Sequence, residues 1–73
     1  MSAIDDRARR IRDAEGTLDS LREALALAGI TLPSLRLHPS TWSDDTGAAL
    51  VDLGPCNLDT AQQIAAAVRK ATA

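Results

Sequence analysis

Cys56 has the clearest chemical potential in this chain of 73 residues, and it is the only cysteine. It stands in the segment Gly-Pro-Cys-Asn-Leu-Asp, at the turn before a predicted helix. A helix dipole and the free amides of a first helical turn stabilise a thiolate, so Cys56 is a candidate reactive thiol with His38 as its base. No thiol-enzyme signature surrounds Cys56, however, and free cysteines typically behave as small buried hydrophobes. We therefore favour a buried, structural Cys56 and expect that the chain is not an enzyme.

Metal and cofactor sites need sets of ligands that one copy of this sequence does not supply. One histidine, His38, and one cysteine are too few for a zinc site. Asp44 and Asp45 lack the ligand spacing of a calcium loop and fit a solvated turn. The sequence has no Gly-rich phosphate loop and no spacing typical of a Ser-His-Asp triad. We expect no metal and no cofactor.

A basic cluster near the N-terminus consists of Arg7, Arg9, Arg10 and Arg12. Such a cluster could contact the phosphates of a nucleic acid. However, Asp5 and Asp6 each precede an arginine by four residues, which is the ordinary pairing of a solvated helix face. The net charge is −2, and the one aromatic residue offers little for base stacking. A small nucleic-acid-binding regulator remains an alternative, but nucleic acid is not the partner that we favour.

Trp42 is the only aromatic residue, and it falls in a polar segment, residues 39–47, with the composition of a loop. A loop tryptophan either folds back over the core or contacts another molecule, since tryptophan is enriched at interface hot spots. Because the chain has so few large side chains for its core, we favour folding back and keep Trp42 as a candidate partner contact.

Residues 3–28 are predicted to form one long helix, because apolar residues recur there every three or four positions. Gly16 lies inside this stretch and either weakens the helix or divides it in two. Gly29 follows as a natural C-terminal cap.

The second half of the chain predicts two strands and a further helix. Apolar and polar residues alternate around residues 35–37 and again over 49–53, as in strands with one buried face. Asn57 or Asp59 can cap a final helix whose apolar stripe consists of Leu58, Ala61, Ile64, Ala65, Val68 and Ala71. The sequence therefore predicts a single α+β domain over residues 1–73, with a long N-terminal helix, a two-stranded antiparallel hairpin and a C-terminal helix.

A seven-residue apolar repeat runs along the predicted N-terminal helix. Its positions are Ile4, Ile11, Leu18 and Leu25, joined by Ala14, Leu21 and Ala28 three residues after the last three of them. Such a repeat places one narrow apolar stripe on a helix, and the stripe needs a partner. A helix over residues 3–28 is about 39 Å long, whereas a five-residue strand spans about 17 Å. We therefore expect the helix to extend past its own hairpin and to leave Ile4 and Ile11 uncovered.

These features favour a non-enzymatic protein–protein interaction module, with an assembly or accessory regulatory role. We expect a homodimer that also binds a second protein, through the interface residues Ile4, Ile11, Leu18, Leu21 and Leu25. The competing interpretation is that these residues pack on Leu35, Leu37, Val51 and Leu53 of the same chain. The lone cysteine and the lack of a long apolar run predict a cytoplasmic protein without a membrane partner.

Overall fold

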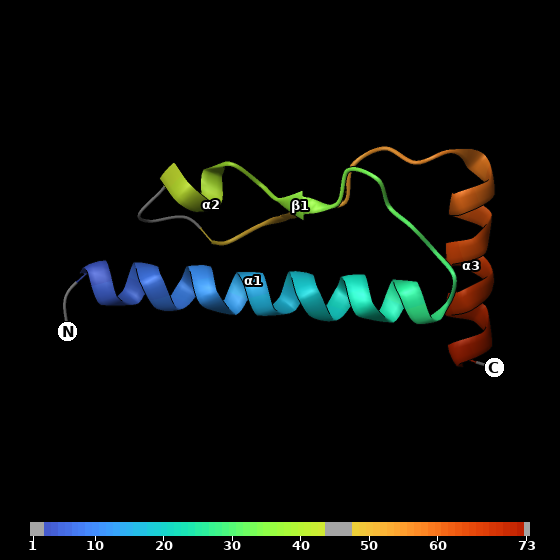
Figure 1. Cartoon of the computed structure of the whole chain (residues 1–73), viewed down its shortest axis with the longest axis horizontal. Coiled ribbons are helices and arrows are strands. Elements are labelled where there is room, and N and C mark those ends of the chain that lie inside the picture. Colours follow the sequence, from blue (N-terminus) through green and yellow to red (C-terminus); the bar gives the residue numbers. More distant parts are fainter. Residues whose placement is uncertain (1–2, 44–47, 73) are drawn as a thin grey trace.

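The structure is a computed structural model that describes residues 3–43 and 48–72. Its elements, in chain order, are helix α1 (Ala3–Leu27), strand β1 (Arg36–Leu37), the one-turn helix α2 (Ser40–Ser43), strand β2 (Val51–Asp52) and helix α3 (Leu58–Thr72). Figure 1 shows the hairpin lying along α1 and α3 standing across the C-terminal end of α1. The predicted α+β fold, with its long first helix, antiparallel hairpin and final helix, is confirmed.

Helix α1 runs without a break through Gly16, so the chain forms one long helix rather than two. It ends in a Schellman motif: Gly29 has a φ of 75°, Ile30 N donates to Leu25 O at 2.8 Å, and Gly29 N donates to Ala26 O at 3.0 Å. The predicted cap at Gly29 is confirmed. Ile30 is buried directly after this cap, which fixes the direction in which the chain leaves α1.

The sheet consists of β1 and β2 in antiparallel register, with Arg36 opposite Asp52 and Leu37 opposite Val51. The strands are shorter than the sequence pattern predicts. Only two residues of each strand form regular antiparallel pairs in the described part of the chain. The Asp52 carboxylate reaches both neighbours: Oδ2 lies 3.5 Å from Arg36 Nε, and Oδ1 accepts a hydrogen bond from Gly54 N at 2.9 Å. Asp52 therefore ties the strand pair to the turn that follows it.

Helix α2 occupies a segment that the sequence pattern predicts as loop. The His38 imidazole caps it, since Nδ1 accepts a hydrogen bond from Ser40 N at 3.1 Å. Thr41 is 1% exposed, and its Oγ1 donates to Leu50 O at 3.3 Å and accepts from Leu50 N at 3.2 Å. The Thr41 side chain thus takes the place of a strand partner for Leu50, and this extends the hairpin beyond its paired strands.

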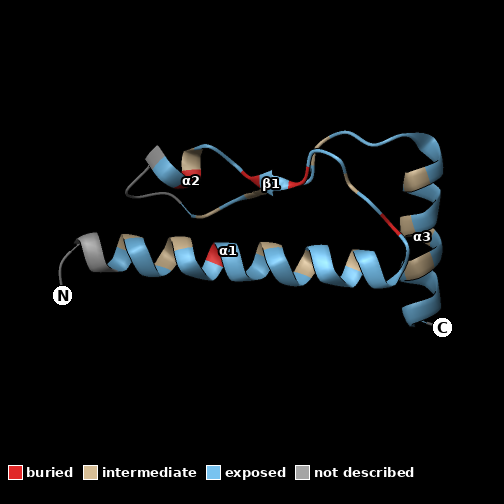
Figure 2. Cartoon of the chain, in the orientation of Figure 1, coloured by how far each residue is buried: buried red, intermediate tan, exposed pale blue. Residues whose placement is uncertain are grey.

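The core lies between the hairpin and one face of α1 (Figure 2). The buried apolar side chains of the described residues are Ala14, Ile30, Leu35 and Leu37. The α1 stripe, which we define as Ile11, Ala14, Leu18, Leu21 and Leu25, is the face turned to this core, and all its members except buried Ala14 are half-buried. Arg22 adds a polar tie, because its Nη2 donates to Leu35 O at 3.1 Å.

The hairpin reaches further along α1 than strand length alone suggests. Ala49 and Val51 line one hollow together with Asp6 and Thr17 of α1, and α2 lies beyond them (Figure 1). Ile11 is half-buried, so it is neither fully covered by the chain nor fully exposed. The side chain of Ile4 lies outside the described residues, as do Asp44 and Asp45.

Helix α3 begins where Asn57 Oδ1 accepts a hydrogen bond from Thr60 N at 2.8 Å, which confirms Asn57 as the cap. A shallow hollow separates α3 from the end of α1, lined by Leu27, Ala28 and Gly29 on one side and by Gln63, Ala66, Ala67 and Lys70 on the other. No described residue of α3 is buried. The half-buried residues of α3 are Thr60, Ile64, Ala65 and Ala67, so the side that the helix turns to the chain includes part of its apolar stripe.

Two glycine substitutions separate backbone constraint from helix propensity. Gly54 has a φ of 70°, and a Cβ there would lie 2.5 Å from Ser34 Cβ. Gly54→Ala should therefore lower the free energy of unfolding by about 1–3 kcal/mol. Gly16 has open space around it, so Gly16→Ala should raise that free energy by about 1 kcal/mol. Urea unfolding followed by far-UV circular dichroism measures both, and equal effects of the two variants would contradict the close approach at Gly54.

A third variant tests the buried hydroxyl of α2. Thr41→Val keeps the shape of the side chain but removes the acceptor for Leu50 N, so it should destabilise the protein by about 1–3 kcal/mol. Thr31→Val is the matched control, because Thr31 is exposed and should change the midpoint little. If the two valine variants unfold at the same urea concentration, the Thr41 bridge does not hold the hairpin.

Candidate protein-binding surface

A groove of about 560 Å³ opens between α1 and the hairpin. It is lined by Glu15, Leu18, Arg22, Arg36, Leu37, Pro39 and Trp42. Leu18 and Trp42, which the sequence suggested for different reasons, therefore border the same groove. Trp42 is 44% exposed, so it neither folds fully into the core nor projects freely.

The floor of the groove is apolar and its rim is charged. Leu37 is buried, and Leu18 is half-buried beside it. The rim arginines are already positioned: Arg22 is bonded to Leu35 O and lies 3.9 Å from Asp19, and Arg36 faces Asp52. Exposed pairs of this kind contribute little to stability, but they hold two guanidinium groups at the edge of an apolar groove. Such a groove fits an apolar side chain of another polypeptide.

The other predicted interface residues extend this surface along α1. Ile11, Leu21 and Leu25 are half-buried, so each keeps part of its apolar surface outside the chain. The hairpin covers one flank of the α1 stripe, and the groove beside Trp42 lies along it. The α1 stripe can therefore pack against the hairpin of its own chain and still offer apolar surface to a partner.

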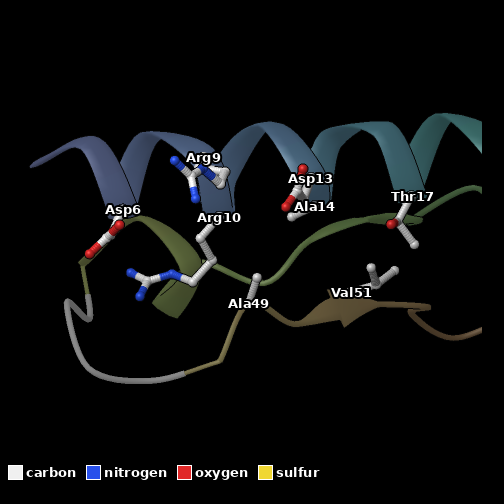
Figure 3. A pocket seen from close by; sticks show the side chains of 8 residues that line it. All are labelled: Asp6, Arg9, Arg10, Asp13, Ala14, Thr17, Ala49 and Val51. Atoms are coloured by element: carbon white, nitrogen blue, oxygen red, sulfur yellow. The ribbon is translucent and has the colours of Figure 1, made fainter. Parts of the chain in front are cut away.

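The arginine cluster does not form one basic face. Arg7 and Arg10 are half-buried, whereas Arg9 and Arg12 are exposed. Figure 3 shows Arg10 extending from α1 toward the hairpin, in a hollow that also contains the carboxylates of Asp6 and Asp13. Acidic groups therefore interleave with the arginines, and Arg10 is turned toward the hairpin.

The structure does not bring Cys56 and His38 together. His38 lies next to Leu50, since His38 N donates to Leu50 O at 2.8 Å, and its imidazole is bonded to Ser40. Cys56 follows the opposite end of the hairpin, beyond Asp52. The interpretation of Cys56 as a buried hydrophobe is wrong, because the thiol is exposed. Among residues 3–43 and 48–72, no three His, Cys, Asp or Glu side chains gather as metal ligands.

The apolar stripe of α3 is partly uncovered, and the sequence pattern identified this stripe without a binding role. Leu58 is 81% exposed and Val68 is 57% exposed. Ala61 and Ala71 are also exposed, and Ile64 is half-buried. The signal was present in the sequence as a well-formed apolar stripe with no obvious element of matching length to cover it.

Comparison with known proteins adds no assignment. No model of a protein family matches the chain, and neither curated proteins nor solved structures gave a significant match. Within the described part of the chain, no helix combines the length and apolar character needed to cross a membrane.

The exposure of Cys56 gives a direct prediction. Iodoacetamide should label Cys56 to completion in the native protein without denaturant, because the structure leaves the thiol accessible. Mass spectrometry of the native and the urea-unfolded protein measures the extent of labelling. Protection that disappears only in urea would show that Cys56 is covered in solution.

Proposed function

We propose that this chain is a non-enzymatic association module, with an assembly or accessory regulatory role, that binds a second copy of itself and a second protein. The observation that carries the proposal is the distribution of its apolar side chains. The described residues bury four of them, whereas six large ones are exposed: Leu27, Trp42, Leu50, Leu53, Leu58 and Val68. Apolar surface left outside a small domain marks contact with other molecules.

The contact that we propose on α1 runs along the open flank of its stripe to the groove beside Trp42. Leu18 belongs to both the stripe and the groove lining, so it joins the two surfaces. A partner that places an apolar side chain between Leu18 and Trp42 would cover both residues and lie close to Arg22 and Arg36. Buried aromatic anchors of this kind dominate the free energy of many interfaces.

Fewer observations favour the two alternative functions, nucleic-acid binding and thiol chemistry. Nucleic-acid binding needs a basic surface, and the hollow that Arg9 and Arg10 line also contains the carboxylates of Asp6 and Asp13. A thiol enzyme needs a base beside its nucleophile, and His38 lies at the other end of the hairpin from Cys56. A cytoplasmic location is part of the proposal, since the fold contains no disulfide among its described residues.

Sedimentation equilibrium of the purified chain tests the α1 contact. Ile11→Asp places a carboxylate in the stripe and should reduce the association constant at least tenfold, before the chain loses its helical circular dichroism. Ala8→Asp is the matched control, because it adds the same charge to an exposed position of α1 and should leave the association unchanged.

Trp42 gives an independent measurement. Its fluorescence should shift to shorter wavelength as the concentration of the native chain rises, because association covers the groove. A native chain that stays monomeric at several hundred micromolar, with a constant emission wavelength, would rule out self-association.

A further inference from the structure

The groove beside Trp42 lies along an unpaired strand edge. The sheet register pairs Leu37 with Val51. One residue further on, His38 N donates to Leu50 O at 2.8 Å, so that pair is hydrogen-bonded. The two kinds of pair alternate along an antiparallel ladder, and Leu37 therefore points its backbone N–H and C=O away from β2. Among the described residues neither group has a hydrogen-bond partner, and such an edge can bind an extended segment of another polypeptide as an added strand.

The groove is on the same side of β1 as these two backbone groups. The C=O of Leu35 also points to that side, because it stands two residues before Leu37, and it accepts the hydrogen bond from Arg22 Nη2 at 3.1 Å. Arg22 and Leu37 both line the groove. A segment that enters the groove can therefore pair with Leu37 but not with its neighbours along the edge, since Leu35 O is engaged and Pro39 has no N–H. Side-chain contacts must supply the rest of the binding.

The two ends of the groove differ in charge. Arg22 and Arg36 line one end, and Glu15 lines the other, about 10 Å from Arg22 along α1. Asp19 and Asp52 each contact one of the arginines through a single nitrogen atom, at 3.9 and 3.5 Å. A guanidinium group has five N–H donors, and the two arginine side chains are 56% and 62% exposed, so both retain donors for another carboxylate. The arginine end of the groove therefore favours an acidic side chain.

The remaining part of the groove favours an apolar side chain. Leu18 and Leu37 form the floor there, and Trp42 forms one side. Leu18 lies one helical turn from Arg22, which is about 6 Å along α1. Side chains two positions apart in a strand lie on one face and about 6.6 Å apart. An extended segment with an apolar and an acidic residue two positions apart therefore matches both parts of the groove.

We infer that the groove beside Trp42 binds an extended acidic segment of the second protein, antiparallel to β1. Because β1 runs from Arg36 toward Trp42, the bound segment reaches Trp42 first. Its apolar residue lies between Leu18 and Trp42, and its carboxylate follows two residues later at the two arginines. The inference rests on the proposed function and names the chemistry of the partner. The contact is one short segment, so we expect a dissociation constant in the micromolar range.

Fluorescence anisotropy with a labelled peptide tests the selection of the segment. The peptide consists of serine and threonine with blocked ends, and it carries one leucine and, two positions after it, one glutamate. Replacement of the glutamate by glutamine should raise the dissociation constant about tenfold, because the charge-assisted bonds to the arginines are lost. A peptide with the glutamate directly after the leucine should bind as weakly, because adjacent side chains point to opposite faces.

Arg36→Gln tests the arginine end of the groove. It should weaken binding of the glutamate peptide about tenfold and leave binding of the glutamine peptide unchanged, whereas Trp42→Ala should weaken both. Arg12→Gln is the matched control, because it removes the same charge from an exposed position of α1 outside the groove. Far-UV circular dichroism checks that each variant keeps its helices. Equal binding of the two peptides by the native chain would overturn the inference.

Methylation of the peptide nitrogens tests the added strand. Only every second residue of a paired strand turns its N–H toward β1, so N-methylation should abolish binding at one of two adjacent residues and be tolerated at the other. Equal effects at both residues would show that the segment does not pair with the edge of β1.

Sedimentation and anisotropy of the native chain and of Ile11→Asp separate this inference from the proposed self-association. Both stand if the native chain associates and Ile11→Asp, although dissociated, still binds the glutamate peptide. A native chain that associates while neither protein binds the peptide overturns the groove inference and preserves the self-contact. A monomeric native chain that binds the glutamate peptide supports the groove and overturns self-association, and a monomer that does not bind overturns both.

Discussion

The packing of the hairpin on one stripe of α1 is the contact on which the rest of the structure depends. Two strands of two residues each cannot stand alone, so the hairpin needs a surface to cover. Ala14 is buried where α1 faces Ala49 and Val51, and Leu35 is buried nearer the C-terminal end of α1, beside Arg22 and Leu25. Arg22 also holds the hairpin to α1 through its hydrogen bond to Leu35 O. Without this layer α1 would lose the element that covers its stripe, and the groove beside Trp42 would lose one wall.

The periodicity of apolar residues predicted the helices and strands. The features that it did not predict depend on hydrogen bonds between residues far apart in the sequence. The helical period marked α1 and its inward face, and the cap at Gly29 followed from the end of that period. Helix α2 could not be predicted in this way, because it depends on the His38 imidazole and on two bonds between Thr41 and Leu50, nine residues away. The same hydrogen bonds extend the hairpin along α1 beyond its paired strands. An estimate from strand length alone therefore made the hairpin too short.

The candidate site was predictable in type but not in arrangement. Composition and the heptad repeat indicated apolar contact surfaces, and Leu18 and Trp42 were both named from the sequence. Their meeting in one groove required the path of the chain around α2. Cys56 shows the opposite case, because its residue type indicated burial whereas the turn before α3 leaves it exposed. The position of α3 was not encoded in any local pattern, since its stripe says only that the helix needs a partner.

Helix α3 receives little support from the rest of the chain. A helix of 15 residues is marginal in water unless tertiary contacts support it, and α3 buries no described residue in its own chain. The cap at Asn57 satisfies one amide at the N-terminal end, and Arg69 and Lys70 complement the dipole at the other, but such terms are each about 1 kcal/mol or less. The support that α3 receives from its own chain therefore comes from its half-buried side, which consists of Thr60, Ile64, Ala65 and Ala67.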